Sequence, residues 1–167
     1  FVRSSMPMLH ASSGYWPSKV REEAIRLCGD LGGNLLEVGC GEGLFLTALA
    51  VGNQSLKIQG IDNWKEMVDK AQERINRLGI SNVKVSRVDS KKMPFMDESF
   101  DIVVCINTLF NLASFNEVTQ NIGELSRVTK ENGKVILDIR NILNPVVFLK
   151  YKFAKYYDST LKVPVHA

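Results

Sequence analysis

Apolar residues follow two different spacings along this chain of 167 residues. Short, nearly continuous apolar runs are typical of strands buried on both faces, whereas apolar residues three and four positions apart are typical of amphipathic helices. Short segments rich in apolar residues predict strands at residues 34–38, 57–62, 83–89, 100–107 and 134–140, and of these 100–107 is almost wholly apolar. The helical spacing predicts helices at residues 19–28, 44–51, 64–78, 114 to about 128, and 144 to about 157. Strands and helices therefore alternate along most of the chain.

Short polar residues mark where several of these helices begin. Ser18, Asn63 and Ser114 are expected to act as caps, because their side chains can accept hydrogen bonds from the free N–H groups of a first helical turn. Glu66 and Glu117 stand three residues after Asn63 and Ser114, which is the spacing of a capping box.

The alternation predicts an α/β fold, a doubly wound parallel sheet with helices on both faces. Asn132-Gly133 is expected to turn the chain into the last strand. Ligands of such sheets bind at the carboxyl ends of the strands, where the strand order reverses. Polar candidates for a site stand at four of the predicted strand ends: Glu37, Asp62, Asp89 and Asn107.

A loop with glycine at every second position joins the first strand to the next helix. From Leu35 the sequence reads LLEVGCGEG. Glycine permits positive φ and close approach of a ligand to the backbone, and the following helix start offers free N–H groups. The loop therefore predicts a nucleotide-cofactor pocket. Its G-x-G-x-G spacing differs from the dinucleotide pattern G-x-G-x-x-G, and the Gly-Lys-Ser/Thr ending of a phosphate-binding P-loop is absent.

Glu37 stands two residues before the first glycine, and E-x-G-x-G-x-G resembles the first motif of the class I S-adenosylmethionine-dependent methyltransferases, in particular the small-molecule, type 11 enzymes. The resemblance runs from about Gly33 to Asp138. The further matching segments are Gly60-Ile61-Asp62, Asp89-Ser90, the strand start Phe100-Asp101, and Ser126-Arg127-Val128 with Asn132-Gly133-Lys134. This resemblance implies a Rossmann-like sheet, S-adenosylmethionine as cofactor and S-adenosylhomocysteine as product.

The resemblance also implies a role for each residue of the pocket. Asp62 would accept hydrogen bonds from the ribose hydroxyls, Asp89 from the adenine amino group, and the backbone N–H of Ser90 would meet the adenine ring. Glu37 would face the methionine end, and the carbonyl of Asn107 would bind its amino group. The complete set of expected cofactor residues is Glu37, Gly39, Cys40, Gly41, Gly43, Asp62, Asn63, Asp89, Ser90 and Asn107.

Other residues near this set have two interpretations. Trp64 and Met67 stand where adenine is expected to lie, but their helical spacing equally predicts packing in the core. Asp101 begins its strand far from the pocket and is expected to be structural. His10 could act as a base, although a surface position is the simpler interpretation, so no catalytic residue is assigned and no metal site is expected.

Composition narrows the class of protein. An apolar content of 45% and a net charge of +3 describe a globular protein and give no argument for nucleic acid. No apolar run is long enough to span a membrane. The cysteines Cys28, Cys40 and Cys105 form no C-x-x-C pair, so we expect reduced, packed thiols and a cytoplasmic location.

The sequence divides into a leader at residues 1–17 that could cap the cofactor, a cofactor-binding domain at 18–140, and a tail at 141–167. The tail interleaves lysine with aromatic residues. It could be a lid over the acceptor, an interfacial helix, or an ordinary helix with a solvated lysine face. Relatives continue past the fifth strand with an antiparallel strand pair, which is not evident before Ala167. We therefore expect a longer natural protein, or a partner chain such as a second copy, to cover this edge.

Methyl transfer to a small molecule is the function that these features favour. The segment from Asn107 to Asn111 lacks the Asn/Asp-Pro-Pro-Tyr/Phe signature of amino-group methylation on nucleobases, which disfavours a nucleic-acid substrate. The methylated atom, whether O, N or C, stays open. Two alternatives also stay open: a non-catalytic module or partner subunit that binds the cofactor, and a nicotinamide-dependent oxidoreductase, against which the glycine spacing argues.

Overall fold

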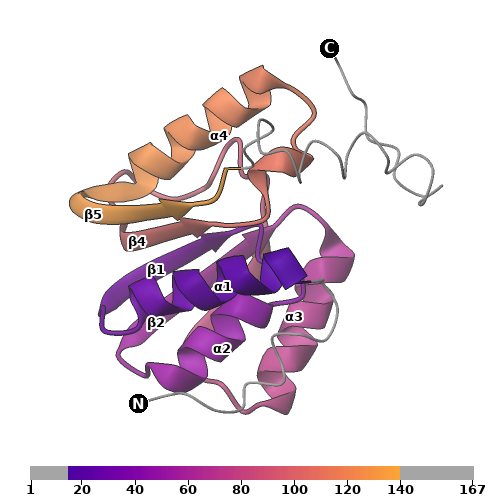
Figure 1. Cartoon of the computed structure of the whole chain (residues 1–167), viewed down its shortest axis with the longest axis vertical. Helices are drawn as coiled ribbons and strands as arrows, with labels where there is room; N and C mark the ends of the chain where they lie inside the picture. Colours follow the sequence, from indigo (N-terminus) through magenta and orange to yellow (C-terminus); the bar gives the residue numbers. More distant parts are fainter. Residues whose placement is uncertain (1–14, 140–167) are drawn as a thin grey trace.

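The computed structural model describes residues 15–139. Helices and strands alternate along this part of the chain, as the apolar spacings predict (Figure 1). The elements are α1 (Tyr15–Cys28), β1 (Gly33–Val38), α2 (Leu44–Gly52), β2 (Leu56–Asp62), α3 (Lys65–Arg77), β3 (Val83–Arg87), β4 (Phe100–Cys105), the 3-10 turn η2 (Leu109–Asn111), α4 (Phe115–Val128) and β5 (Thr129–Leu137). The leader up to residue 14, with His10, and the predicted tail helix lie outside the described residues.

The strands form one parallel sheet in the order β3-β2-β1-β4-β5. From β1 the chain adds β2 and β3 toward one edge of the sheet, and it then returns to add β4 and β5 toward the other edge. The strand order therefore reverses between β1 and β4. A crevice is expected at the carboxyl ends of these two neighbours. This arrangement confirms the predicted Rossmann-like fold and places the glycine loop, which follows β1, at the reversal.

Helices cover the sheet on both faces. Helices α1, α2 and α3 lie on one face, and α4 lies on the other, over β4 and β5 (Figure 1). Two apolar clusters fill the layers: one contains Leu35 and Ile58 beneath α1 to α3, and the other contains Leu36 and Val103 beneath α4. Adjacent residues of β1 thus point into opposite layers, as strand geometry requires.

Two predicted helix caps are wrong. The first helix begins at Tyr15, three residues before Ser18, so Ser18 is a buried helical residue whose hydroxyl accepts a hydrogen bond from Arg21. Pro17 is tolerated because the first turn of a helix needs no N–H donor. In α3 the N-cap residue is Trp64 rather than Asn63, and the carboxylate of Asp62 accepts the Trp64 N–H. The Asp62 carboxylate, one residue before Asn63, therefore accepts the hydrogen bond at the start of α3 in place of the Asn63 side chain.

The cap of α4 is confirmed. The Ser114 hydroxyl accepts the Glu117 N–H at 3.3 Å, and the Glu117 carboxylate accepts the Ala113 N–H at 3.0 Å. Asp101 is also structural, because it accepts the Asn34 N–H and the Lys130 ammonium at the far end of the sheet from the glycine loop.

The last strand differs from its prediction. It begins at Thr129, so Asn132-Gly133 lies within the strand instead of before it. The pairing with β4 jumps from Phe100 opposite Thr129 to Ile102 opposite Lys134, which is an irregularity that absorbs the extra residues. Within the described sheet β5 is an outer strand, and Val135 is 42% exposed.

Arg127 fastens the loop between β3 and β4 to α4. Its guanidinium donates to the carbonyl oxygens of Met93 and Phe95 at 3.0 and 2.7 Å. It also contacts the carboxylates of Glu124 and Asp97 at 2.6 and 2.7 Å. These carboxylates raise the pKa of Arg127, so the side chain stays charged. One side chain therefore holds several loop groups at once.

Replacing Arg127 with alanine is expected to lower the free energy of unfolding by roughly 2–3 kcal/mol, because several charged hydrogen bonds are lost together. Urea denaturation measures this change. Arg26→Ala is the control, since its ion pair with Glu23 lies on the exposed face of α1 and should contribute little. Equal losses in the two variants would contradict the assigned role of Arg127.

Candidate cofactor site

The glycine loop is held at the reversal of strand order by the ends of its neighbours. The N–H groups of Gly39 and Cys40 both donate to the carbonyl of Ile61 on β2, at 2.8 and 2.9 Å. The hydroxyl of Thr108, which follows β4, lies 3.3 Å from the Val38 carbonyl and 3.0 Å from the Ile106 carbonyl, so it can donate to either. A β-carbon at Gly39 would collide with the Thr108 side chain, with its Cγ2 at 2.6 Å. Glycine at this position therefore permits close packing of the loop on the segment after β4.

Gly41 faces open space instead. Its φ is +51°, and a β-carbon placed there would meet no protein atom within 4 Å. The Gly41 N–H donates to the Asp62 carboxylate at 2.9 Å. The third glycine, Gly43, packs against Ala71 of α3. The loop thus presents one open position, at Gly41, next to a carboxylate.

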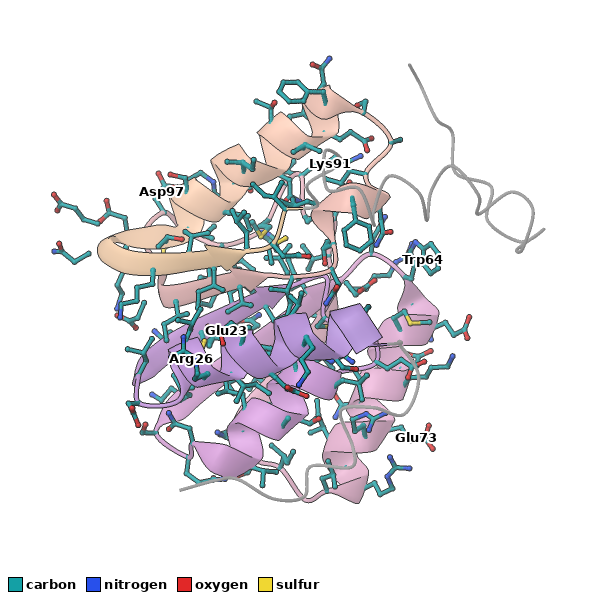
Figure 2. All side chains as sticks on the ribbon, in the orientation of Figure 1. Glu23, Arg26, Trp64, Glu73, Lys91 and Asp97 are labelled. Atoms are coloured by element: carbon teal, nitrogen blue, oxygen red, sulfur yellow. The ribbon has the colours of Figure 1, made fainter. Side chains whose placement is uncertain are left out.

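Asp62 connects the loop to the next helix. One carboxylate oxygen accepts the Gly41 N–H and the other accepts the Trp64 N–H at 2.9 Å. Each carboxylate oxygen can accept a second hydrogen bond, so acceptor capacity remains for a ligand. Trp64 itself is 69% exposed and extends away from the sheet, which rules out packing in the core (Figure 2). Met67 is half-buried.

Glu37 is the most buried carboxylate of the site, with 3% of its surface exposed. Its Oε2 atom has no hydrogen-bond partner among residues 15–139. Burial raises the pKa of Glu37 well above 4.5, while the positive charge of Arg21 and the Leu46 N–H oppose the shift. A buried, unpartnered carboxylate oxygen is costly, and a cationic ligand group would remove that cost.

Asn107 and Asp138 meet at the ends of β4 and β5. Asn107 has a φ of +55°, which is uncommon for a residue other than glycine. Its N–H donates to the Asp138 carboxylate at 2.6 Å, and its side-chain amide lies 3.5 Å from the carbonyl of Pro17. The start of α1 therefore lies beside this end of the sheet. Asp138 was missed as a site residue, although its position directly after a strand was a usable signal.

Asp89 and Ser90 follow β3 and form a tight turn. The Asp89 carboxylate accepts the Lys91 N–H at 3.0 Å, and its carbonyl accepts the Lys92 N–H. The Ser90 hydroxyl accepts a hydrogen bond of 2.6 Å from Asn121 on α4. Asn121 is fully buried and was not a sequence candidate, because only the packing of α4 brings it to this loop.

The structure therefore gathers most of the predicted residues at one edge of the sheet. Asn63 is the exception, because its side chain is exposed. Its backbone carbonyl accepts a hydrogen bond from Arg87. Cys40 is buried in the core cluster, so only its backbone faces the loop. In the described part of the chain, four strands have a carboxylate at or near their carboxyl ends: Glu37, Asp62, Asp89 and Asp138.

Comparison with known proteins identifies the family. The sequence profile of a methyltransferase domain matches residues 30–159. The chain belongs to this methyltransferase family. It is 34% identical over 107 residues to a phosphatidylethanolamine N-methyltransferase of Cereibacter sphaeroides, covering 64% of this chain and 50% of the relative. It is 31% identical to a demethylmenaquinone methyltransferase of Alkalihalophilus pseudofirmus, covering 63% of this chain and 44% of the relative.

A solved structure supports the same assignment. A SAM-dependent methyltransferase from Aquifex aeolicus superimposes with a TM-score of 0.62 and 26% identity, covering 77% of each chain. S-adenosylmethionine is thus the cofactor to which family and structure point. The chain spans about half the length of the curated relatives it matches. No helix within residues 15–139 is both long and apolar enough to cross a membrane.

Proposed function

We propose that this chain binds S-adenosylmethionine at the carboxyl edge of the sheet and transfers its methyl group to a small-molecule acceptor. The observation that carries the proposal is the acidic character of this edge, where Glu37, Asp62, Asp89 and Asp138 stand at the ends of four strands. S-adenosylmethionine bears a sulfonium and an ammonium charge, which carboxylates attract. An acid at the end of β2 would also suit the ribose of a nicotinamide cofactor, so it is the G-x-G-x-G spacing of the loop that disfavours the oxidoreductase alternative.

The residues present fit this cofactor. Glu37 offers an unpartnered, buried oxygen to the ammonium group. Asp62 would accept hydrogen bonds from the ribose hydroxyls, and Asp89 from the adenine amino group. The open space above Gly41 leaves room for the ligand where a side chain would fill it. Cys40, Gly43, Asn63, Ser90 and Asn107 would complete the pocket, largely through their backbones.

The bound cofactor would supply an activated methyl group, so the protein's own contribution is placement. Its residues must orient the cofactor and exclude water, while the acceptor atom is held in line behind the methyl carbon. Asn107 and Asp138 stand at the end of the sheet where the acceptor would approach. A general base is needed only for some acceptors, and no residue is assigned that role.

The acceptor is proposed to be a small molecule, as the names of the two relatives suggest for those proteins. One relative is named for an amine-bearing phospholipid and the other for a demethylated quinone, so both chemical classes are candidates. Transfer of a labelled methyl group from S-adenosylmethionine to phosphatidylethanolamine vesicles or to demethylmenaquinone would identify the class. Binding of the cofactor without transfer to any acceptor would instead support the non-catalytic module.

The primary test is calorimetric titration with S-adenosylhomocysteine and, separately, with NAD. Micromolar binding of the first ligand without binding of the second is the expected result. Binding of NAD alone, or of neither ligand by a folded sample, would overturn the proposal.

Replacing Gly41 with alanine is expected to weaken S-adenosylhomocysteine binding about tenfold or more, because the new methyl group enters the open space of the pocket. Gly79→Ala is a matched control: Gly79 also has positive φ, +63°, and open space, but it follows α3 at the opposite edge of the sheet. Both variants should lose similar stability from backbone strain, about 1 kcal/mol. Similar affinities in the two variants would argue against a ligand over Gly41.

A further inference from the structure

The loop that follows β3 is fastened along one side of α4. Lys91 forms an ion pair of 3.0 Å with Glu117, Asn121 donates to Ser90 at 2.6 Å, and Glu124 accepts the Met93 N–H at 2.7 Å. Residues 117, 121 and 124 are four and three positions apart and therefore share one face of the helix. Figure 2 shows Lys91 and Asp97 beside opposite ends of α4, so the loop runs along the helix.

Asn121 is the buried member of this contact. No part of its surface is exposed, its amide nitrogen donates to the Ser90 hydroxyl, and its amide oxygen lies 4.0 Å from the Cys105 thiol in hydrogen-bonding geometry. Because both ends of the amide have partners on different elements, its orientation is fixed. The position of Ser90 is therefore set by α4 and β4, not only by the turn that contains it.

Glu117 extends this connection to a second loop. One oxygen of its carboxylate contacts the Lys91 ammonium, and the other accepts the Ala113 N–H at 3.0 Å. Ala113 belongs to the segment that leads from β4 to α4. The ion pair between Lys91 and Glu117 is half-buried. The hydrogen bond from Lys91 lowers the pKa of Glu117, so the carboxylate stays ionised. The loops after β3 and β4 thus share one anchor.

We propose that Asn121 is a positioning residue for the adenine end of the cofactor. By holding Ser90, it fixes the turn that presents the Asp89 carboxylate, and it thereby determines how strongly the site prefers an exocyclic amino group on the purine. The inference rests on the proposed function, since it assumes that adenine is bound at Asp89 and Ser90.

The chemical reason is the opposite hydrogen-bonding character of two purines. The amino group of adenine donates to a carboxylate, whereas the carbonyl oxygen at the same position of hypoxanthine cannot and is repelled. Such discrimination requires the carboxylate to stand at a fixed place, because hydrogen bonds weaken steeply with distance and angle. A loosened turn could move away from the carbonyl and would lose the preference.

The test compares S-adenosylhomocysteine with S-inosylhomocysteine, which carries hypoxanthine, by calorimetry on the full chain. The unchanged chain is expected to prefer the adenine ligand at least about tenfold. Asn121→Leu, which keeps the branched shape of the side chain but removes its hydrogen bonds, should reduce this preference about fivefold or more, chiefly by weakening the adenine ligand. Gln120→Ala, at the neighbouring exposed position of α4, should leave the preference unchanged.

A general loss of packing would weaken both ligands by the same factor, so an unchanged ratio in Asn121→Leu overturns the inference. If Asn121→Leu does not fold, Ser90→Ala removes the same hydrogen bond from the loop side, and its ratio decides the question in the same way. Failure of the unchanged chain to bind S-adenosylhomocysteine would overturn the proposed function itself. Binding by the unchanged chain with no change of ratio in the variants would overturn only the role of Asn121.

Discussion

Replacing Asp62 with alanine should weaken S-adenosylhomocysteine binding by more than about a hundredfold. The proposed pair of hydrogen bonds from the ribose hydroxyls to a carboxylate is worth roughly 1.5–3 kcal/mol each, and both are lost. The variant also leaves the N–H groups of Gly41 and Trp64 without their acceptor, so the glycine loop and the start of α3 lose their common anchor. Calorimetry measures the affinity. Thermal unfolding without ligand measures how much stability the variant loses because the Gly41 and Trp64 N–H groups have no acceptor.

Two further variants separate these effects. Asp62→Asn keeps one acceptor oxygen and should bind with intermediate affinity. Asp69→Ala removes an exposed carboxylate of α3 that pairs with Lys65 across one helical turn, and it should bind normally. Retention of affinity by Asp62→Ala would mean that the ligand does not contact the carboxyl end of β2.

Replacing Glu37 with glutamine is expected to change the free energy of unfolding and the affinity for the ligand in opposite directions. Burial raises the folded-state pKa of Glu37 above its unfolded value of 4.5, so its stabilising contribution is present below about pH 4.5 and is lost as the pH rises through the folded pKa. The free energy of unfolding of Glu37→Gln, relative to the unchanged chain, should therefore increase with pH over this window. Urea denaturation at a series of pH values tests the sign.

Ligand binding should show the opposite pH dependence. The ammonium group of S-adenosylhomocysteine requires an ionised Glu37, so affinity of the unchanged chain should rise with pH through the folded pKa, and binding below it should release a proton. Glu37→Gln should bind about ten- to a hundredfold more weakly at neutral pH, with little dependence on pH. A binding enthalpy that is independent of the ionisation enthalpy of the buffer would contradict this link.

Local sequence signals were sufficient for the strands and the glycine loop. The central strands β1 and β4 are short and rich in apolar residues, and the glycine spacing follows β1 directly, so both could be located without long-range information. Placement of Glu37 and Asp62 at one edge followed from the parallel order of the sheet alone. These are the features for which local pattern and overall fold agree.

Long-range contacts explain the errors and omissions. Asn63 has good capping chemistry, but Asp62 at the end of β2 already reaches the Trp64 N–H. Asn121 resembles any polar residue of an amphipathic helix until the fold brings Ser90 and Cys105 to it. Asn132-Gly133 lies among the extra residues of the irregular pairing between β5 and β4, so the dipeptide stands inside the strand and not before it.

The enclosed cysteines give this chain an internal set of probes. Burial raises the pKa of Cys28 to about 11 and that of Cys105 to about 12, and it also raises the pKa of Cys40. Alkylating reagents attack the thiolate, so these thiols should react only when the surrounding layer opens. Cys28 and Cys40 lie in the layer beneath α1 to α3, whereas Cys105 lies beneath α4. The labelling rates of the individual cysteines would show whether the layers on the two faces of the sheet open together or independently.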